Sequence, residues 1–182
     1  MKALLIIDLQ NDFLPGGPLP APGGNGIIPV INNIMGLFDT IIASKDWHPS
    51  RTKHFGKWPV HCIRETEGAE FPEAFNREQV QKLFLKGTGT GDDGYSAFEA
   101  TSSDLQSYLE EQGVTRLFLS GLTTEYCVKA TALDAIRRGF LTFLIKDAVA
   151  GVEAREDDVE KAIREMEMAG VIITDSKMLE LM

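Results

Sequence analysis

Short apolar runs alternate along the chain with longer segments in which apolar residues recur every three or four positions. The short runs, each followed by polar residues or a turn, predict six strands at 3–7, 39–44, 82–86, 117–120, 142–145 and 171–174. The longer segments predict four helices at 27–38, 103–111, 128–138 and 157–169. Strands that alternate with helices are typical of a parallel sheet, because each crossover lays a helix on one face. We therefore predict a three-layer α/β/α fold with a mainly parallel sheet and right-handed connections, built by residues 1–182 as one domain.

The composition narrows the class of protein without identifying it. The 182 residues suit one domain, and 43% apolar with 25% charged residues is ordinary for a folded soluble protein. A net charge of −9 without a Lys/Arg cluster argues against nucleic acid or an anionic membrane as partner. No apolar run approaches 18 residues, and the run at 3–7 is too short for a signal peptide, so we expect a cytoplasmic protein. In that reducing compartment Cys62 and Cys127 should be free thiols.

Cys127 lies where a predicted strand turns into a predicted helix. The segment 121–127, with the sequence GLTTEYC, follows strand 117–120 and precedes the alanine-rich helix 128–138. In the first turn of a helix, the free backbone N–H groups and the helix dipole favour thiolate over thiol, and those N–H groups can hold an oxyanion. The position makes Cys127 a candidate nucleophile. The alternative is a small buried side chain without a reactive role, which is the common fate of a free cysteine.

Asp8 and Lys86 also lie at the carboxyl ends of predicted strands, 3–7 and 82–86. Because these ends meet at one edge of a parallel sheet, we expect Asp8, Lys86 and Cys127 to converge there. Taken singly, Asp8 could be a cap and Lys86 a solvated surface residue. Together, a carboxylate, an ammonium group and a thiol suffice for acyl transfer, in which the acid takes the thiol proton and returns it to the leaving group.

All three histidines of the chain fall within fourteen residues and lie next to an aspartate; the group is Asp46, His48, His54 and His61. Imidazole and carboxylate ligands suit Zn²⁺, Fe²⁺ or Mn²⁺, and an Asp-x-His pair at a strand end can turn both donors toward one point. A lone histidine is more often a packed side chain, but the clustering favours one divalent metal ion. If His61 binds it, Cys62 should pack inward, because neighbours in an extended segment point opposite ways.

Two other segments carry weaker indications. The loop 87–94, GTGTGDDG, is predicted to be flexible, and it lacks the G-x-G-x-x-G spacing of a dinucleotide site. Near the C-terminus, apolar residues form either a subunit contact or the last turn of a core helix; they are Met178, Leu179, Leu181 and Met182.

Six stretches occur in order across nearly the whole chain: ALLIIDLQNDF at 3–13, DWHP at 46–49, WPVHC at 58–62, KG at 86–87, YSAF at 95–98 and GLTTEYCV at 121–128. In combination they resemble the isochorismatase-like cysteine hydrolase superfamily and, within it, the nicotinamidase (pyrazinamidase) family. The resemblance implies the three-layer fold of these hydrolases. It also implies a homo-oligomer that acts on a small-molecule amide.

The resemblance assigns roles to residues already singled out. It implies Asp8 as general base and acid, Lys86 as its electrostatic partner and Cys127 as nucleophile. It further implies a cis peptide between Leu122 and Thr123, and an oxyanion hole formed by the backbone N–H groups of Thr123 and Cys127.

The resemblance also implies the lining of the substrate site. Asp46, His48 and His61 are the implied metal ligands; His54 is an optional further ligand, because its position holds histidine in some members and serine in others. The expected ion is Zn²⁺, with Fe²⁺ or Mn²⁺ as alternatives. The aromatic residues expected to bind the pyridine ring of a substrate are Phe13, Trp58 and Tyr126.

The implied activity is hydrolysis of nicotinamide to nicotinate and ammonia through a cysteine thioester, a step of NAD salvage. The alternatives are another amide, carbamoyl or ureido hydrolase of the superfamily, or a vinyl-ether hydrolase, although those relatives generally lack the metal site. A catalytically silent metal-binding or interaction module is a distant third.

The sequence departs from the family at Thr123-Thr124-Glu125, where many members have Ala-Thr-Asp, and in a short loop at 51–57. Both departures lie at the expected pocket edge, where they affect the choice of substrate more than the chemistry.

Overall fold

Six parallel strands form a single sheet at the centre of the molecule. The computed structural model describes residues 1–181. The strands are β1 (Lys2–Ile7), β2 (Thr40–Asp46), β3 (Lys82–Lys86), β4 (Arg116–Leu122), β5 (Leu141–Ala150) and β6 (Ile172–Thr174). They lie in the order β3-β2-β1-β4-β5-β6, and all five neighbouring pairs are parallel. The predicted three-layer α/β fold is therefore confirmed, with a sheet that is wholly parallel.

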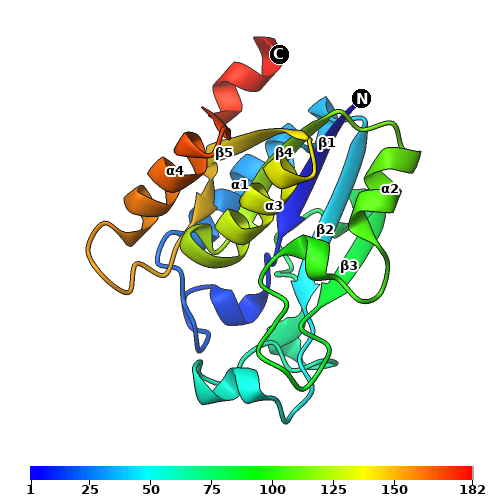
Figure 1. Cartoon of the computed structure of the whole chain (residues 1–182). Coiled ribbons are helices and arrows are strands. Elements are labelled where there is room, and N and C mark those ends of the chain that lie inside the picture. The colour runs from blue at the N-terminus through cyan, green and yellow to red at the C-terminus, as the bar shows by residue number, and fades with distance from the viewer. Residues whose placement is uncertain (182) are drawn as a thin grey trace.

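Helices cover both faces of this sheet (Figure 1). The helices are α1 (Gly24–Ile34), α2 (Leu105–Glu111), α3 (Lys129–Arg137) and α4 (Asp158–Met168). Figure 1 shows α3 and α4 in front of the sheet and α1 behind it, and the buried side chains divide in the same way. Each helix buries its apolar stripe against the sheet, which accounts for the helical spacing in the sequence.

β1 shows how the sequence produces two cores. After Lys2, its residues 3–7 are apolar in an unbroken run because both faces of the strand are buried there. Leu4 and Ile6 pack on the α1 side with residues such as Ile31. Their neighbours at odd positions point the other way, into the core formed by α2, α3 and α4. This burial of residues 3–7 on both faces makes β1 the centre of the fold.

The strand order reverses between β1 and β4, because the chain builds outward to β3 on one side and to β6 on the other. Ligands of open α/β sheets bind at such a reversal, outside the carboxyl ends of the strands. Asp8 follows β1 there, and in β2 and β3 Asp46 pairs in register with Lys86. The topology thus brings these strand ends to one edge of the sheet.

All six predicted strands and all four predicted helices are present, but two boundaries differ substantially. Helix α1 begins at Gly24 and ends at Ile34, where a 3₁₀ turn, Met35–Leu37, follows, whereas a helix over 27–38 was predicted. The first turn was not predicted because it contains Gly24 and Gly26, and glycine has a low helix propensity. Strand β5 continues to Ala150, five residues past its predicted end, because the exposed polar pair 146–147 interrupts the apolar run without ending the strand.

The C-terminal apolar residues divide between core and surface. Leu179 packs into the core on the α1 side, whereas Met178 and Leu181 are exposed. Met182, the last residue of that predicted group, lies outside the described residues. Among the helices of the described chain, none is long and apolar enough to cross a membrane.

Candidate active site

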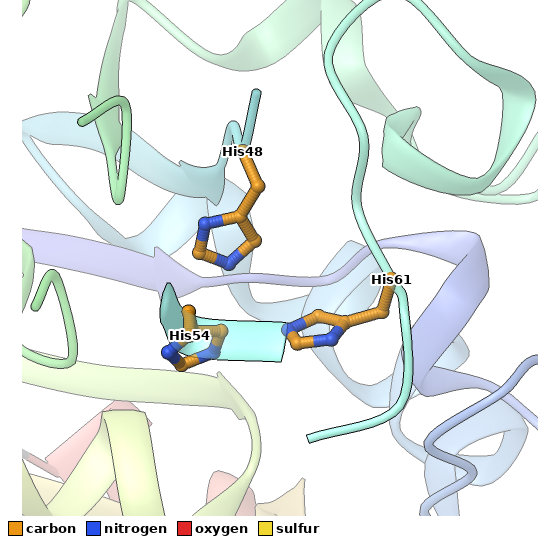
Figure 2. A group of neighbouring side chains, drawn as sticks. All are labelled: His48, His54 and His61. Atoms are coloured by element: carbon orange, nitrogen blue, oxygen red, sulfur yellow. The ribbon is translucent and has the colours of Figure 1, made fainter. Parts of the chain in front are cut away.

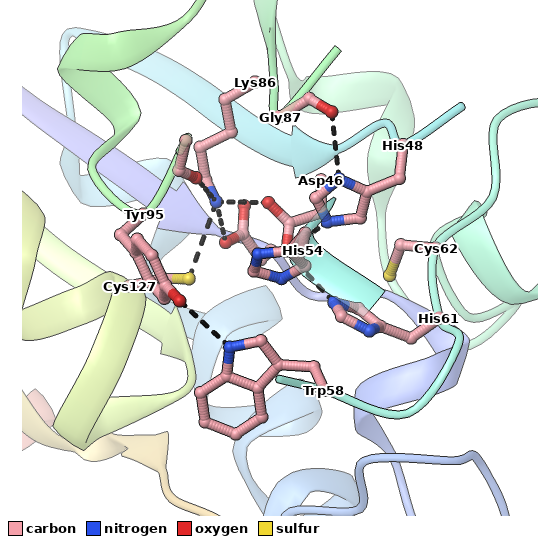
Figure 3. A network of polar contacts seen from close by, with 12 residues as sticks. Asp46, His48, His54, Trp58, His61, Cys62, Lys86, Gly87, Tyr95 and Cys127 are labelled. Carbon is pink, nitrogen blue, oxygen red and sulfur yellow. Dashed lines mark hydrogen bonds and ion pairs between the residues drawn. The ribbon is translucent and has the colours of Figure 1, made fainter. Parts of the chain in front are cut away.

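Lys86 is the charged centre of a buried cluster at the carboxyl edge of the sheet. Its ammonium nitrogen donates to Asp46 Oδ1, to the carbonyl oxygen of Gly94 at 2.7 Å and to Cys127 Sγ at 3.5 Å. It also lies 2.8 Å from Asp8 Oδ2. Asp8, Lys86 and Cys127, the three catalytic residues predicted from strand ends, are therefore together. Figure 3 shows Lys86 beside Cys127.

The two carboxylates beside Lys86 have different protonation behaviour. Burial raises the pKa of Asp8 above the ordinary aspartate value, although Lys86 opposes the shift. Burial acts in the same direction on Asp46, but there the Lys86 ammonium group and the hydrogen bonds of His48 and His61 together outweigh it and hold the pKa well below that value. Two acids whose pKa values are pushed apart can take separate roles. Asp8 is suited to exchange a proton, whereas Asp46 stays anionic.

Each carboxylate oxygen of Asp8 has a polar partner. Ser44 Oγ donates to Oδ1 at 2.8 Å. Oδ2 is paired with the Lys86 ammonium nitrogen, which also donates to Asp46, Gly94 and Cys127. Cys127 Sγ and carboxylate oxygens of Asp8 and Asp46 all lie within 4.8 Å of one another. The Asp8 carboxylate, paired with Lys86, thus lies close enough to the thiol to accept its proton.

The turn that carries Cys127 leaves the sheet between β1 and β5. Gly121 has a φ of +104°, and a Cβ at this position would lie 2.0 Å from the carbonyl oxygen of Ile7, so only glycine fits. The Leu122–Thr123 peptide is cis, as the family resemblance implied. A π-helical turn, Thr124–Val128, then leads into α3 and holds Cys127.

One prediction about Cys127 was wrong. The position at the start of a helix suggested a thiolate, but burial raises the pKa of the Cys127 thiol well above its usual value, and Lys86 only partly offsets this. The buried environment therefore favours the neutral thiol, which must lose its proton to a base before it can react.

The three histidines meet on the other side of Asp46, and ligand nitrogens of all three lie within 4.8 Å of one another (Figure 2). His48 Nε2 and His61 Nε2 lie 3.6 and 3.8 Å from Asp46 Oδ2. The histidine cluster and its aspartate, predicted from clustering in the sequence, are therefore assembled around one point. His54, the optional member, belongs to the cluster in space.

The polar contacts of the histidine rings fit a metal ion. Each Nδ1 has an oxygen partner: the Gly87 carbonyl for His48 at 2.9 Å, the Pro59 carbonyl for His61 at 2.7 Å, and a carboxylate for His54 at 2.8 Å. Donation through Nδ1 leaves Nε2 as a lone-pair donor toward the cluster. Within residues 1–181, His48 Nε2 is buried without a hydrogen-bond partner, as expected of a nitrogen reserved for a cation.

Gln10 anchors the strand end that carries Asp46. Its side-chain oxygen accepts from the Asp46 N–H at 2.8 Å, and its Nε2 donates to the Asp46 carbonyl at 2.8 Å and the Ala69 carbonyl at 2.9 Å. Because these backbone groups are buried, each needs such a partner. The fully buried amide therefore fixes the carboxylate that faces both Lys86 and the histidines.

A pocket is lined by residues of both the Lys86 cluster and the histidine cluster. Its lining combines site residues with apolar and aromatic side chains: Phe13, Leu19, Asp46, His54, Trp58, His61, Gly94, Tyr95, Thr123, Tyr126, Cys127 and Val152. Trp58 and Tyr126 meet edge to face with ring centres 4.8 Å apart. The pocket therefore contains all three aromatic residues predicted to bind substrate, and both residues predicted to form the oxyanion hole.

The loop from Gly87 to Gly94, predicted to be flexible, contacts three site residues. The Gly87 carbonyl accepts from His48, the Gly94 carbonyl accepts from Lys86, and Asp92 accepts from His54. Sequence reasoning missed Asp92 because nothing in a Gly- and Asp-rich loop marks a contact with a histidine 38 positions away. It also missed Leu19 and Val152 as pocket residues, because only the chain path brings them there.

Cys62 is buried in the core on the α1 side and is not bonded to Cys127; both cysteines are free, as predicted. Its backbone N–H donates to Asp12 Oδ2 at 2.6 Å, and its carbonyl accepts from the His48 N–H at 3.0 Å. These bonds align the segment of His61 beside His48, while the thiol packs inward.

Known proteins with the same architecture identify the family. The family model for the Isochorismatase domain matches residues 2–178. The chain is 36% identical to the nicotinamidase of Acinetobacter baylyi, over 93% of this chain and 90% of that protein. The crystal structure of the pyrazinamidase of Pyrococcus horikoshii in complex with zinc is 39% identical with a TM-score of 0.84, over 96% and 98% of the two chains. PnC1 from L. infantum in complex with nicotinate is 31% identical with a TM-score of 0.91, over 97% and 93%. This chain belongs to the isochorismatase domain family.

Proposed function

We propose that this protein is a nicotinamidase, which hydrolyses the carboxamide of nicotinamide to nicotinate and ammonia. One observation carries the proposal: the Cys127 thiol lies beside Asp8 and Lys86 in a pocket whose other walls are aromatic rings and a histidine cluster. A thiol beside a buried base can act as the nucleophile in acyl transfer, because the base removes the thiol proton. The relatives named nicotinamidase or pyrazinamidase act on aromatic carboxamides by name, and their similarity spans nearly the whole chain.

The first half of the reaction makes a thioester. Asp8 Oδ2 accepts the thiol proton, and Cys127 Sγ attacks the carboxamide carbon. The backbone N–H groups of Thr123 and Cys127 hold the resulting oxyanion, an interaction worth roughly 3 kcal/mol per donor in such sites. Asp8 then gives its proton to the departing nitrogen, and ammonia leaves. The raised pKa of Asp8 suits this exchange, because the acid must both take and return a proton.

The second half releases the acid. A water molecule gives one proton to Asp8 and attacks the thioester carbon. The carbon–sulfur bond breaks, the Cys127 sulfur recovers the proton from Asp8, and the nicotinic acid formed loses its remaining proton to solvent as nicotinate. Lys86 keeps its charge throughout, since Asp46 and Asp8 raise its pKa well above the usual value against the effect of burial. It stabilises Asp8 and Cys127 whenever either is anionic.

The residues that would hold a metal ion are Asp46, His48 and His61, with His54 as a further ligand. Nitrogen and carboxylate donors of this kind suit zinc, which we propose as the ion because the similar Pyrococcus structure contains it. When bound, the ion would supply a positive centre that attracts a pyridine nitrogen and fixes the ring in the pocket. The carboxamide chemistry itself belongs to Asp8, Lys86 and Cys127.

The pocket chemistry matches a flat aromatic amide. Phe13, Trp58 and Tyr126 offer ring faces and edges to a pyridine ring, and such contacts contribute about 0.5–1.5 kcal/mol each beyond burial. The reaction would return nicotinamide to NAD synthesis. We also propose that it takes place in a reducing compartment such as the cytoplasm, because its nucleophile must remain a free thiol.

Ammonia release from nicotinamide by the zinc-loaded protein tests the proposal, with Cys127→Ala beside it. We expect turnover by the wild-type protein and a loss of at least about 10⁴-fold in the variant, because the nucleophile is gone. Nicotinamide binding, measured by calorimetry, should persist in Cys127→Ala. Absence of release by zinc-loaded wild-type protein, with activity on a carbamoyl or ureido compound, would instead establish the alternative amide hydrolase.

A further inference from the structure

Asp92 lies outside all six stretches that carry the family resemblance, and its carboxylate contacts two different walls of the pocket. Oδ1 accepts from His54 Nδ1 at 2.8 Å and from the Tyr95 hydroxyl at 3.3 Å. Oδ2 accepts from Lys57 Nζ at the surface. The Tyr95 oxygen in turn accepts from Trp58 Nε1 at 2.9 Å (Figure 3). One side chain therefore joins a histidine of the metal cluster to an aromatic residue of the substrate pocket.

The protons in this chain of contacts can run in only one direction. A carboxylate accepts and cannot donate, so His54 must carry its proton on Nδ1 and present Nε2 to the other histidines. The Tyr95 hydroxyl has one proton, which it gives to Asp92, and its oxygen is then free for the Trp58 N–H. Asp92 thus fixes both the tautomer of His54 and the orientation of the Tyr95–Trp58 pair.

The position of Asp92 is itself fixed by the backbone around it. The Lys53 N–H donates to the Thr90 carbonyl at 3.0 Å, and Thr52 Oγ1 donates to the Gly91 carbonyl at 2.7 Å. These bonds tie the loop 87–94 to the segment 52–58, which carries both His54 and Trp58. The loop 87–94 therefore holds the Asp92 carboxylate beside the segment 52–58, which is not part of any strand.

We propose that Asp92 is a positioning residue that couples metal binding by His54 to the placement of the substrate wall at Trp58. This inference rests on the proposed function in taking His54 as a metal ligand. Without the carboxylate, the His54 ring is free to rotate and to change tautomer, and the Tyr95 hydroxyl loses the acceptor that orients it. Asp8, Lys86 and Cys127 do not depend on Asp92 for any of their contacts described above, so the bond-making steps should be unaffected once metal and substrate are bound.

The first test measures zinc affinity by competition with a chromophoric chelator in Asp92→Ala, Asp92→Asn and Asp93→Ala. Asp93 is the matched control, because it is the adjacent acid and its side chain is exposed. We expect the zinc dissociation constant to rise about 10–100-fold in Asp92→Ala, as for other outer partners of metal-ligating histidines. Asp92→Asn should lose less, because its amide oxygen can still accept from His54. Asp93→Ala should match the wild-type protein.

The second test reads coupling through the substrate, at zinc concentrations that saturate every variant. We expect Asp92→Ala to raise the KM for nicotinamide several-fold with kcat unchanged, while the visible spectrum of the Co²⁺-substituted protein changes because His54 is no longer held. A merely structural role would alter neither the spectrum nor the split between KM and kcat. Should Asp92→Ala fail to fold, as judged by circular dichroism of the metal-free protein, Asp92→Asn decides.

The possible outcomes separate this inference from the proposed function. Equal zinc affinities in Asp92→Ala and Asp93→Ala, with active wild-type enzyme, would overturn the role of Asp92 alone. A loss of zinc affinity with unchanged KM would overturn the coupling to Trp58. Conversely, wild-type protein that binds zinc in an Asp92-dependent manner without hydrolysing nicotinamide would support the metal part and overturn the function. Wild-type protein that binds no zinc would overturn the proposed metal site and this inference together.

Discussion

The catalytic charges and the histidine cluster share one pocket, but the protein places them by different means. Asp8, Asp46 and Lys86 lie at or directly after strand ends, where the ladder of the sheet sets their spacing. His54 and His61 instead come from the irregular segment between β2 and β3, which is held by polar contacts with other loops. The first group is built on the rigid part of the molecule and the second on its connections.

This difference divides the tasks of the site. Proton transfer needs groups that stay aligned within a fraction of an ångström, and the central strands of a buried sheet provide that rigidity. A metal site and a substrate pocket must admit their ligands, and loops on a fixed scaffold are the usual place for them. Damage to the strand-end group should therefore affect chemistry and global stability, whereas damage to the loops should affect binding with a smaller loss of stability.

The largest effect is expected when Lys86 is replaced. Lys86→Met leaves two buried carboxylates without their cation, so the free energy of unfolding should fall by about 3–5 kcal/mol and kcat by at least about 10³-fold. Urea unfolding of the metal-free protein measures the first and ammonia release the second.

Lys129→Met is the matched control for that substitution. Lys129 forms an ion pair with Glu165 at 2.9 Å in which both side chains are partly exposed, and such pairs contribute about 1 kcal/mol or less. Equal losses of stability in Lys86→Met and Lys129→Met would show that burial does not distinguish the two ion pairs.

A smaller effect is expected in the loop that contacts the site. Gly94 has a φ of +84°, and a Cβ there would lie 2.3 Å from the backbone nitrogen of Gly87. Gly94→Ala should therefore shift both glycine carbonyls away from Lys86 and His48, with a loss of about 1–3 kcal/mol in the free energy of unfolding and weaker zinc binding. The measurements are urea unfolding and chelator competition.

Gly89→Ala provides the control in the same loop, because a Cβ at Gly89 would meet no heavy atom within 4 Å. It should leave the free energy of unfolding within about 0.5 kcal/mol of wild type. If Gly94→Ala were equally silent, the loop could not hold Lys86 and His48 as the hydrogen bonds indicate.

The same division explains what the sequence could predict. Strand ends can be located from an apolar run followed by a polar residue, and parallel topology then brings Asp8 and Lys86 together. Cys127 joins them through the turn Thr124–Val128, which follows the end of β4. Clustering of three histidines predicted the second group without any knowledge of the loop path. The family resemblance added the residues that carry no pattern of their own, such as Thr123, Phe13 and Trp58.

Long-range contacts of loops were beyond that reasoning. Asp92 and Gln10 are defined by partners 38 and 36 positions away, and no local periodicity encodes such a pairing. The protonation of Cys127 was misjudged for a related reason. Helix position is readable from the sequence, but the extent of burial, which decides the thiol pKa, depends on the packing of the whole site.

The pH dependence of activity is the subtlest way to separate the two groups. Burial raises the pKa of Asp8 above the ordinary aspartate value of 3.8, in spite of Lys86, and the reaction needs the carboxylate to accept the thiol proton. As the pH falls through this raised pKa, Asp8 becomes neutral, so kcat/KM should fall about tenfold per pH unit on an acid limb whose midpoint lies above 3.8.

Measuring at saturating zinc separates this acid limb from a loss of activity caused by loss of the metal. Asp92→Asn should leave the midpoint in place, because Asp92 faces His54, Lys57 and Tyr95 and not Asp8. A midpoint at or below 3.8, or one that moves with zinc concentration, would mean that the acid limb reports the histidine cluster and not Asp8.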